Sequence, residues 1–156
     1  HILLWEAEAH IELGEIKEGI ELINQVRNRA AKSSYVKSWG DPSKCYNGTC
    51  PDFGGYAANY KIGLYPETLS KAEAREAVRT ENRLECAMEG ERFFDLVRWG
   101  IAADVMNKFF ECERDNRVYY QGTTFTAGKD EYLPITNNQY KFSGRNYVQN
   151  PGYGQF

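Results

Sequence analysis

Glu85 and Glu89 are the two side chains of this sequence whose type and spacing best suit acid–base chemistry. Four residues apart, they would lie on one face of a helix, and most glycoside hydrolases work with two carboxyl groups of unequal pKa. Three arginines, Arg83, Arg92 and Arg98, stand close to them in the sequence. Nearby cations lower the pKa of a carboxyl group, whereas a general acid needs it raised. We therefore expect a structural role for this pair and no enzymatic activity.

The run 81–100 that contains this pair mixes charged side chains with large apolar ones. From Glu89 to Arg98, opposite charges recur every three residues, a spacing that sets them side by side on a helix. Charges next to apolar side chains such as Phe93 and Trp99 lose part of their hydration and should pair with one another. We predict a structural polar network made of Arg83, Glu85, Glu89, Arg92, Asp95 and Arg98.

A second group of candidates lies in the segment 32–67, which is rich in Gly, Asn, Ser and aromatic residues. Loops of this length inside a compact domain are often functional. Aromatic rings can carry the flat C–H faces of sugars, while amides and carboxylates bind sugar hydroxyls, so the mixture is that of a ligand site. The alternative is that the rings anchor a long loop to the helices beneath it. The candidate ligand-binding residues are Trp39, Tyr46, Asp52, Tyr56, Asn59 and Tyr60.

The four cysteines fall into two kinds. Cys45 and Cys50 bracket a turn-forming insert, and a disulfide there would contribute on the order of 2 kcal/mol and imply an oxidising compartment. A metal site is the alternative, but no second cysteine pair stands nearby and both histidines are remote, so we expect no metal and no cofactor. Cys86 and Cys112 fall at apolar helical positions, which predicts buried free thiols.

The N-terminal thirty residues predict a pair of helices. Residues 2–13 have helical apolar spacing and are followed by Gly14, a helix-stop residue, and a second helix is expected over 16–30. The segment 14–20 resembles the turn of a tetratricopeptide repeat, in which small residues let two antiparallel helices approach.

The rest of the chain predicts further helices and turns. Ser70 and Glu73 form a capping box, and the helix that they open is expected to reach 88–89. A further helix, either continuous or broken at Gly100, is expected over 91–113, and a short strand over 118–125. The 156 residues have a net charge of −3, and the sequence contains no basic cluster that could neutralise a row of phosphates. This argues against a nucleic-acid-binding protein.

Three ordered motifs resemble the SusD/RagB family. The run 81–100 is similar to that family's pattern ERRLELAFEGHRFFDLRRWG, the segment 131–135 to its LPIP turn, and 149–153 to its closing QNPGY. The sequence departs from these patterns at Asn82, Cys86, Glu91 and Thr136.

This resemblance implies a mainly α, SusD-like helical fold with tetratricopeptide-type helix pairs and long irregular loops. Residues 1–156 would be the C-terminal part of such a domain. Within it, 1–31 would be a helix pair, 32–67 an aromatic loop insert, and 68–156 the signature helices and C-terminal turns.

The resemblance also implies a function. Members of this family are lipoproteins on the extracellular face of the outer membrane of Bacteroidetes-type bacteria. They bind nutrients without catalysis and pass them to a SusC-type TonB-dependent transporter. We therefore expect an oligosaccharide-capturing subunit, held by an N-terminal lipid anchor outside this sequence. A peptide-capturing, RagB-like subunit is the first alternative, and a secreted glycoside hydrolase the second.

Overall fold

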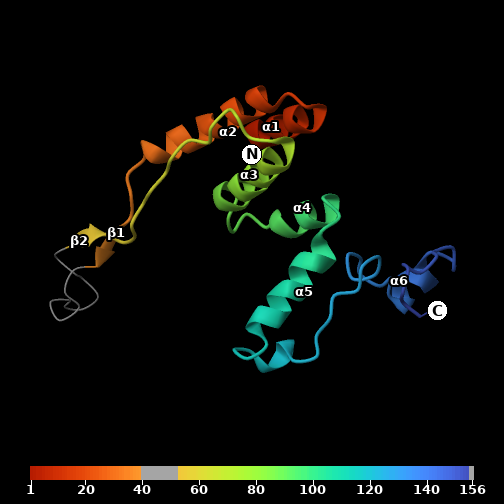
Figure 1. The fold of residues 1–156 in the computed structure, drawn as a ribbon. Coiled ribbons are helices and arrows are strands. Elements are labelled where there is room, and N and C mark those ends of the chain that lie inside the picture. The colour runs from red at the N-terminus through yellow and green to blue at the C-terminus, as the bar shows by residue number, and fades with distance from the viewer. Residues whose placement is uncertain (40–52, 155–156) are drawn as a thin grey trace. The chain divides into compact units, whose positions relative to one another are not determined.

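The computed structural model describes residues 1–39 and 53–154. They are mainly helical, with one two-stranded antiparallel sheet (Figure 1), which confirms the expected fold class. The chain forms two compact units, His1–Ala87 and Met88–Phe156. No helix in the described ranges is both long and apolar enough to cross a membrane.

The first unit begins with two helices packed against each other, α1 (Ile2–Leu13) and α2 (Ile16–Ala31). Gly14 ends α1 in the left-handed conformation at φ 93°, and its N–H donates to carbonyls of the last turn. Gly19 lies where the helices are in close contact, since an added Cβ there would stand 2.6 Å from Cγ1 of Ile11. The predicted helix pair is confirmed to within one residue.

The third helix, α3 (Lys71–Glu85), packs on both α1 and α2. Its predicted capping box is present, because the Ser70 hydroxyl accepts from the N–H of Glu73 while the Glu73 carboxylate accepts from the N–H of Ser70. The helix ends at Glu85, three or four residues earlier than predicted, and the following turns include Met88 at φ 68°. The core of the unit consists of Leu4, Ala7, Ile11, Ile20, Ile23, Val26, Ala74, Ala77 and Val78.

Between α2 and α3 the chain forms strands β1 (Lys37–Trp39) and β2 (Phe53–Tyr56), which pair antiparallel. The chain then comes back along α2 towards α3 (Figure 1). We call residues 61–69 the return segment. The side chain of Asn24 on α2 holds it, donating to the carbonyl of Tyr65 at 2.9 Å and accepting from its N–H at 2.8 Å.

The second unit contains α4 (Arg92–Arg98), α5 (Ala102–Glu113), the short 3-10 helix η2 (Val118–Tyr120) and α6 (Asn137–Phe142). Leu96, Ala102 and Phe125 form its small core. The predicted strand over 118–125 is wrong, because the chain there turns on itself through the Tyr120 N–H to Arg117 carbonyl hydrogen bond.

Two of the C-terminal motifs meet in space. The Gln149 amide accepts from the N–H of Ile135 at 2.8 Å and donates to the carbonyl of the same residue at 2.9 Å. The Tyr153 hydroxyl donates to the carbonyl of Tyr132 at 2.8 Å. The closing segment therefore holds the segment 131–135 by its backbone, which gives the two motifs one structural role.

Candidate ligand-binding surface

Three tyrosines form a ring cluster at the base of the strand pair. Tyr35 and Tyr60 stack with ring centroids 4.7 Å apart and an angle of 14° between the rings. Tyr56 meets Tyr35 edge-on at 5.5 Å and Tyr60 edge-on at 6.3 Å. The Tyr35 hydroxyl donates to the carbonyl of Ala31, which fixes the cluster to the end of α2.

The cluster leaves one ring mostly open to solvent. Tyr56 is 63% exposed, whereas Tyr35 and Tyr60 are half-buried because they cover one face of each other. Asn59 is exposed beside them in the chain and adds an amide that can donate and accept. An exposed ring, with an amide three residues further along the chain, has the chemistry to bind a sugar or a peptide side chain.

The other candidates from the segment 32–67 are placed less fully. Trp39 ends β1 with its backbone opposite Phe53, and its side chain is outside the described part. Tyr46, Asp52 and the predicted disulfide pair Cys45 and Cys50 lie outside the described residues. Their roles stay predictions.

Tyr65 belongs to the same aromatic-rich segment but is bound to the helices. Its backbone pairs with Asn24, and the guanidinium of Arg27 lies over its ring at 4.6 Å. Arg27 also donates from Nε to the carbonyl of Gly63. The anchoring role that the sequence left open for these rings therefore applies to Tyr65.

The charges of the predicted polar network are divided between the two units. Glu85 on α3 pairs with Arg29 on α2, and Asp95 pairs with Arg98 across 3.1 Å within α4. Arg83 and Glu89 are exposed and form no ion pair with another described residue. The interpretation of all six residues as one network stays a prediction.

One largely buried ion pair was not identified from the sequence. Nη1 of Arg27 on α2 lies 2.7 Å from Oε2 of Glu81 on α3, and the side chains are 15% and 6% exposed. The residues are 54 positions apart. Helical spacing reveals only neighbours on the same helix, so no local signal could have found this pair.

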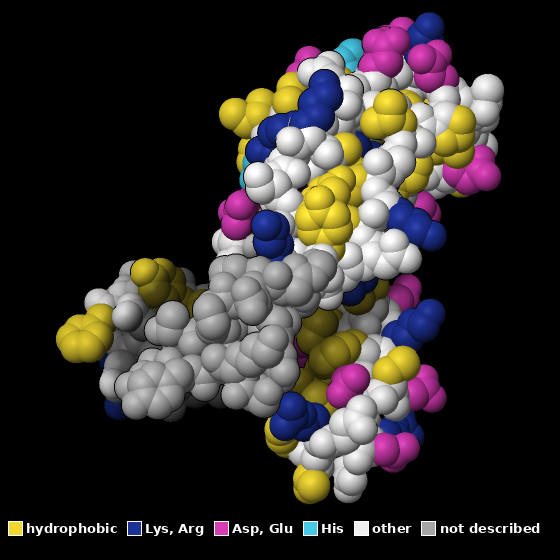
Figure 2. Space-filling view, turned by 90° about the vertical axis from the view of Figure 1, so that its left-hand side faces the viewer, with side chains coloured by type: hydrophobic (Ala, Val, Ile, Leu, Met, Phe, Trp, Pro, Cys, Tyr) yellow, Lys and Arg dark blue, Asp and Glu magenta, His cyan; other side chains and the backbone are white. Residues whose placement is uncertain are grey.

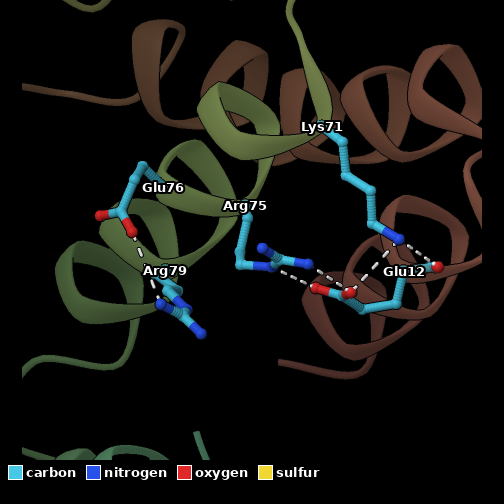
Figure 3. A network of polar contacts seen from close by, with 5 residues as sticks. All are labelled: Glu12, Lys71, Arg75, Glu76 and Arg79. Atoms are coloured by element: carbon cyan, nitrogen blue, oxygen red, sulfur yellow. Dashed lines mark hydrogen bonds and ion pairs between the residues drawn. The ribbon is translucent and has the colours of Figure 1, made fainter. Parts of the chain in front are cut away.

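A second inter-helix contact is exposed (Figure 3). Arg75 on α3 donates from Nε and Nη2 to the two carboxylate oxygens of Glu12 on α1, at 2.6 and 2.7 Å. Lys71 donates to the Glu12 carbonyl at 2.6 Å. The hydrogen bond and charge of Arg75 lower the pKa of Glu12 to about 2.

The two cysteines in the described residues have different environments. Cys86 is a buried free thiol, as predicted, with its Sγ 3.6 Å from the Asn82 amide oxygen. Cys112 is free but exposed. The prediction of burial was wrong there because α5 buries only Ala102 fully, and this thiol lies on a side of the helix that the unit does not cover.

Comparison with known proteins agrees with this architecture. The SusD family model matches residues 1–153, and the chain belongs to that family. It is 33% identical over 118 residues to the SusD-like protein P38 of Formosa agariphila, a match that covers 76% of this chain and 19% of the relative. The match thus spans about a fifth of that curated relative.

Proposed function

We propose that this chain is part of a cell-surface nutrient-binding subunit that captures oligosaccharides. In this proposal a lipid anchor outside the sequence holds the protein on the extracellular face of the outer membrane. The captured glycan passes to a SusC-type TonB-dependent transporter. Membership of the SusD family supports the class of function, and the tyrosine cluster with its exposed Tyr56 ring supports a binding surface on this chain.

The observation that carries the proposal is the open ring of Tyr56 on a fixed base. Its two neighbours hold each other by stacking, and Tyr35 is tied to the end of α2. A sugar that lies on this ring would find the Asn59 amide nearby in the chain. Binding is favoured because the ring needs little reorganisation to receive a ligand.

The test measures glycan binding to the intact protein on a glycan array and then by calorimetry. We expect saturable oligosaccharide binding that Tyr56→Ala weakens by roughly fivefold, since one aromatic contact contributes about 1 kcal/mol and 1.4 kcal/mol is tenfold in affinity. Trp39→Ala should also weaken it. Tyr119→Ala is the matched control, because Tyr119 is similarly exposed at 66% and also packs on a tyrosine, in the second unit. Unchanged binding by both Tyr56→Ala and Trp39→Ala would contradict the proposal.

Peptide capture is the second candidate, and one observation favours it. The sheet contains only β1 and β2 among the described residues, so each strand has an outer edge where an extended peptide could add. The strands have three and four residues, which limits such pairing. We therefore place glycan capture first, and peptide binding without glycan binding in the same measurements would reverse this order.

A further inference from the structure

A groove of about 450 Å³ lies between the return segment and α3, within the first unit. Alanine side chains of α3 leave its floor shallow and apolar. Figure 2 shows hydrophobic side chains lying among charged and polar ones on the surface of the described residues. The residues that matter here are Tyr65 and Leu69 of the return segment and Ala72, Glu73, Glu76 and Thr80 of α3.

The ring that lines this groove is held in place. The guanidinium of Arg27 lies over the Tyr65 ring, 4.6 Å from its centroid. The Asn24 amide donates to the Tyr65 carbonyl and accepts from the Tyr65 N–H. The Lys17–Glu67 ion pair at 3.3 Å adds a further contact between α2 and the return segment. An aromatic platform that is already ordered loses little conformational entropy when a ligand arrives.

Two carboxylates that line the groove, those of Glu73 and Glu76, each have one oxygen available to accept a hydrogen bond from a ligand. Oε2 of Glu73 accepts from the N–H and the hydroxyl of Ser70 at 2.8 and 2.6 Å, which leaves its Oε1 without a partner among the described residues. Oε1 of Glu76 lies 3.5 Å from Nη1 of Arg79, and its Oε2 has no hydrogen bond or ion pair with another described residue. The hydrogen bonds from Ser70 lower the pKa of Glu73, so this carboxylate stays ionised and accepts hydrogen bonds.

The charge around the groove is balanced. Figure 3 shows Glu76 beside Arg79, and Arg75 and Lys71 both directed at Glu12. A basic peptide would gain little net attraction from carboxylates whose surroundings already contain these cations, and an anionic glycan would meet two carboxylates. A neutral ligand with adjacent hydroxyl groups suits an apolar floor edged by acceptors.

We propose that this groove is a second saccharide subsite, in which a neutral sugar unit packs against Tyr65 and donates hydroxyl hydrogen bonds to Glu73 and Glu76. The inference rests on the proposed glycan-binding function. It adds a site made of residues that the tyrosine cluster does not use, and it specifies uncharged sugars.

The test uses the intact protein and neutral hexasaccharides of the cello, xylo, laminari and manno series as probes in calorimetry. Tyr65→Leu should weaken binding of the best probe by roughly fivefold, whereas Tyr65→Phe should bind as the parent does, because it keeps the ring. The hydrogen bonds to Asn24 use the Tyr65 backbone and survive both substitutions. Thermal unfolding of Tyr65→Leu and Tyr65→Phe separates loss of the fold from loss of the ring.

A second variant, Ala72→Trp, fills the groove from an exposed position and should weaken binding without loss of stability. If Ala72→Trp and Tyr65→Leu bind with the affinity of the parent while Tyr56→Ala binds more weakly, the subsite is contradicted and the proposed function is still supported. No binding of any of these neutral hexasaccharides would remove the subsite, and only the absence of binding to every glycan on the array would also remove the proposed function. Saturable binding of trilysine that Ala72→Trp abolishes would assign the groove to a basic peptide and overturn the subsite.

Discussion

Arg27 and Glu81 join α2 to α3 through a hydrogen bond of 2.7 Å between side chains that are almost fully buried. The same guanidinium holds the return segment through the ring of Tyr65 and the carbonyl of Gly63. One side chain therefore connects three parts of the first unit, and its loss should affect both packing and the position of the return segment.

We expect Glu81→Leu to lower the free energy of unfolding by about 3 kcal/mol, because it leaves the Arg27 charge buried without its carboxylate. Urea denaturation measures this. The double variant Arg27→Met/Glu81→Leu should cost clearly less than the sum of the two single changes, since no charge then stays buried alone. The control is Arg29→Met, whose side chain is 69% exposed and whose loss should cost less than about 1 kcal/mol. Strict additivity of the two single changes would show that the pair is not coupled.

The two hydrogen bonds between the Asn24 side chain and the Tyr65 backbone predict that loss of Asn24 destabilises the return segment locally. Asn24→Ala removes one donor and one acceptor from the Tyr65 backbone, so amide hydrogen exchange of Tyr65 should accelerate by roughly tenfold or more, in line with about 1–3 kcal/mol for a lost buried partner. The amides of Ile20 and Ile23, in the core of α2, should keep their protection. Equal acceleration in both places would indicate global destabilisation and contradict a local role.

The close approach of α1 and α2 predicts that Gly19 tolerates no side chain. In Gly19→Ala the new Cβ would lie 2.6 Å from Cγ1 of Ile11 and 2.9 Å from the carbonyl oxygen of Ala7. We expect a loss of about 1–3 kcal/mol from overpacking, although alanine favours a helix by about 1 kcal/mol over glycine. Gly63→Ala is the matched control, because an added Cβ there has no atom within 4 Å. Thermal melting of the two variants compares them, and a more stable Gly19→Ala would show that the helices can separate at no cost.

The Glu12–Arg75 contact predicts a dependence of stability on acid pH. The pKa of Glu12 is about 2 in the folded chain against an ordinary value of 4.5, so the contact contributes fully above about pH 4.5 and is lost as the pH falls towards 2. Solvent screens this exposed pair, which limits the contribution to about 1 kcal/mol or less. The difference in unfolding free energy between the parent and Glu12→Gln should therefore be present at pH 6 and vanish near pH 2. A difference that grows on acidification would contradict this.

Local patterns predicted the helices of the first unit because each signal acts over a few residues. Gly14 as a helix stop and the Ser70–Glu73 capping box are satisfied within their own turns, and both are confirmed. The strands β1 and β2 were missed, because Gly and aromatic residues in that segment suggested only a loop. The predicted strand over 118–125 failed because turn hydrogen bonds replaced a partner strand there.

The candidate site was less accessible from sequence than the fold. Composition identified Tyr56 and Tyr60 but could not show that Tyr60 stacks with Tyr35 and is partly used in packing. Contacts between distant positions, such as Asn24 with Tyr65, leave no periodic trace. The groove along α3 depends on such contacts, so it became visible only in three dimensions.

Asn24 and Arg27 fasten the chain where it comes back to the helices, while Tyr35 is tied to α2 where it leaves them. The chain between these two attachments has both ends fixed on the helices of the first unit. Its length and side chains can be exchanged at little entropic cost, because closing a longer loop between fixed ends adds only about 0.6 kcal/mol per doubling. A transplant of this segment between family members would therefore be expected to leave the three helices intact.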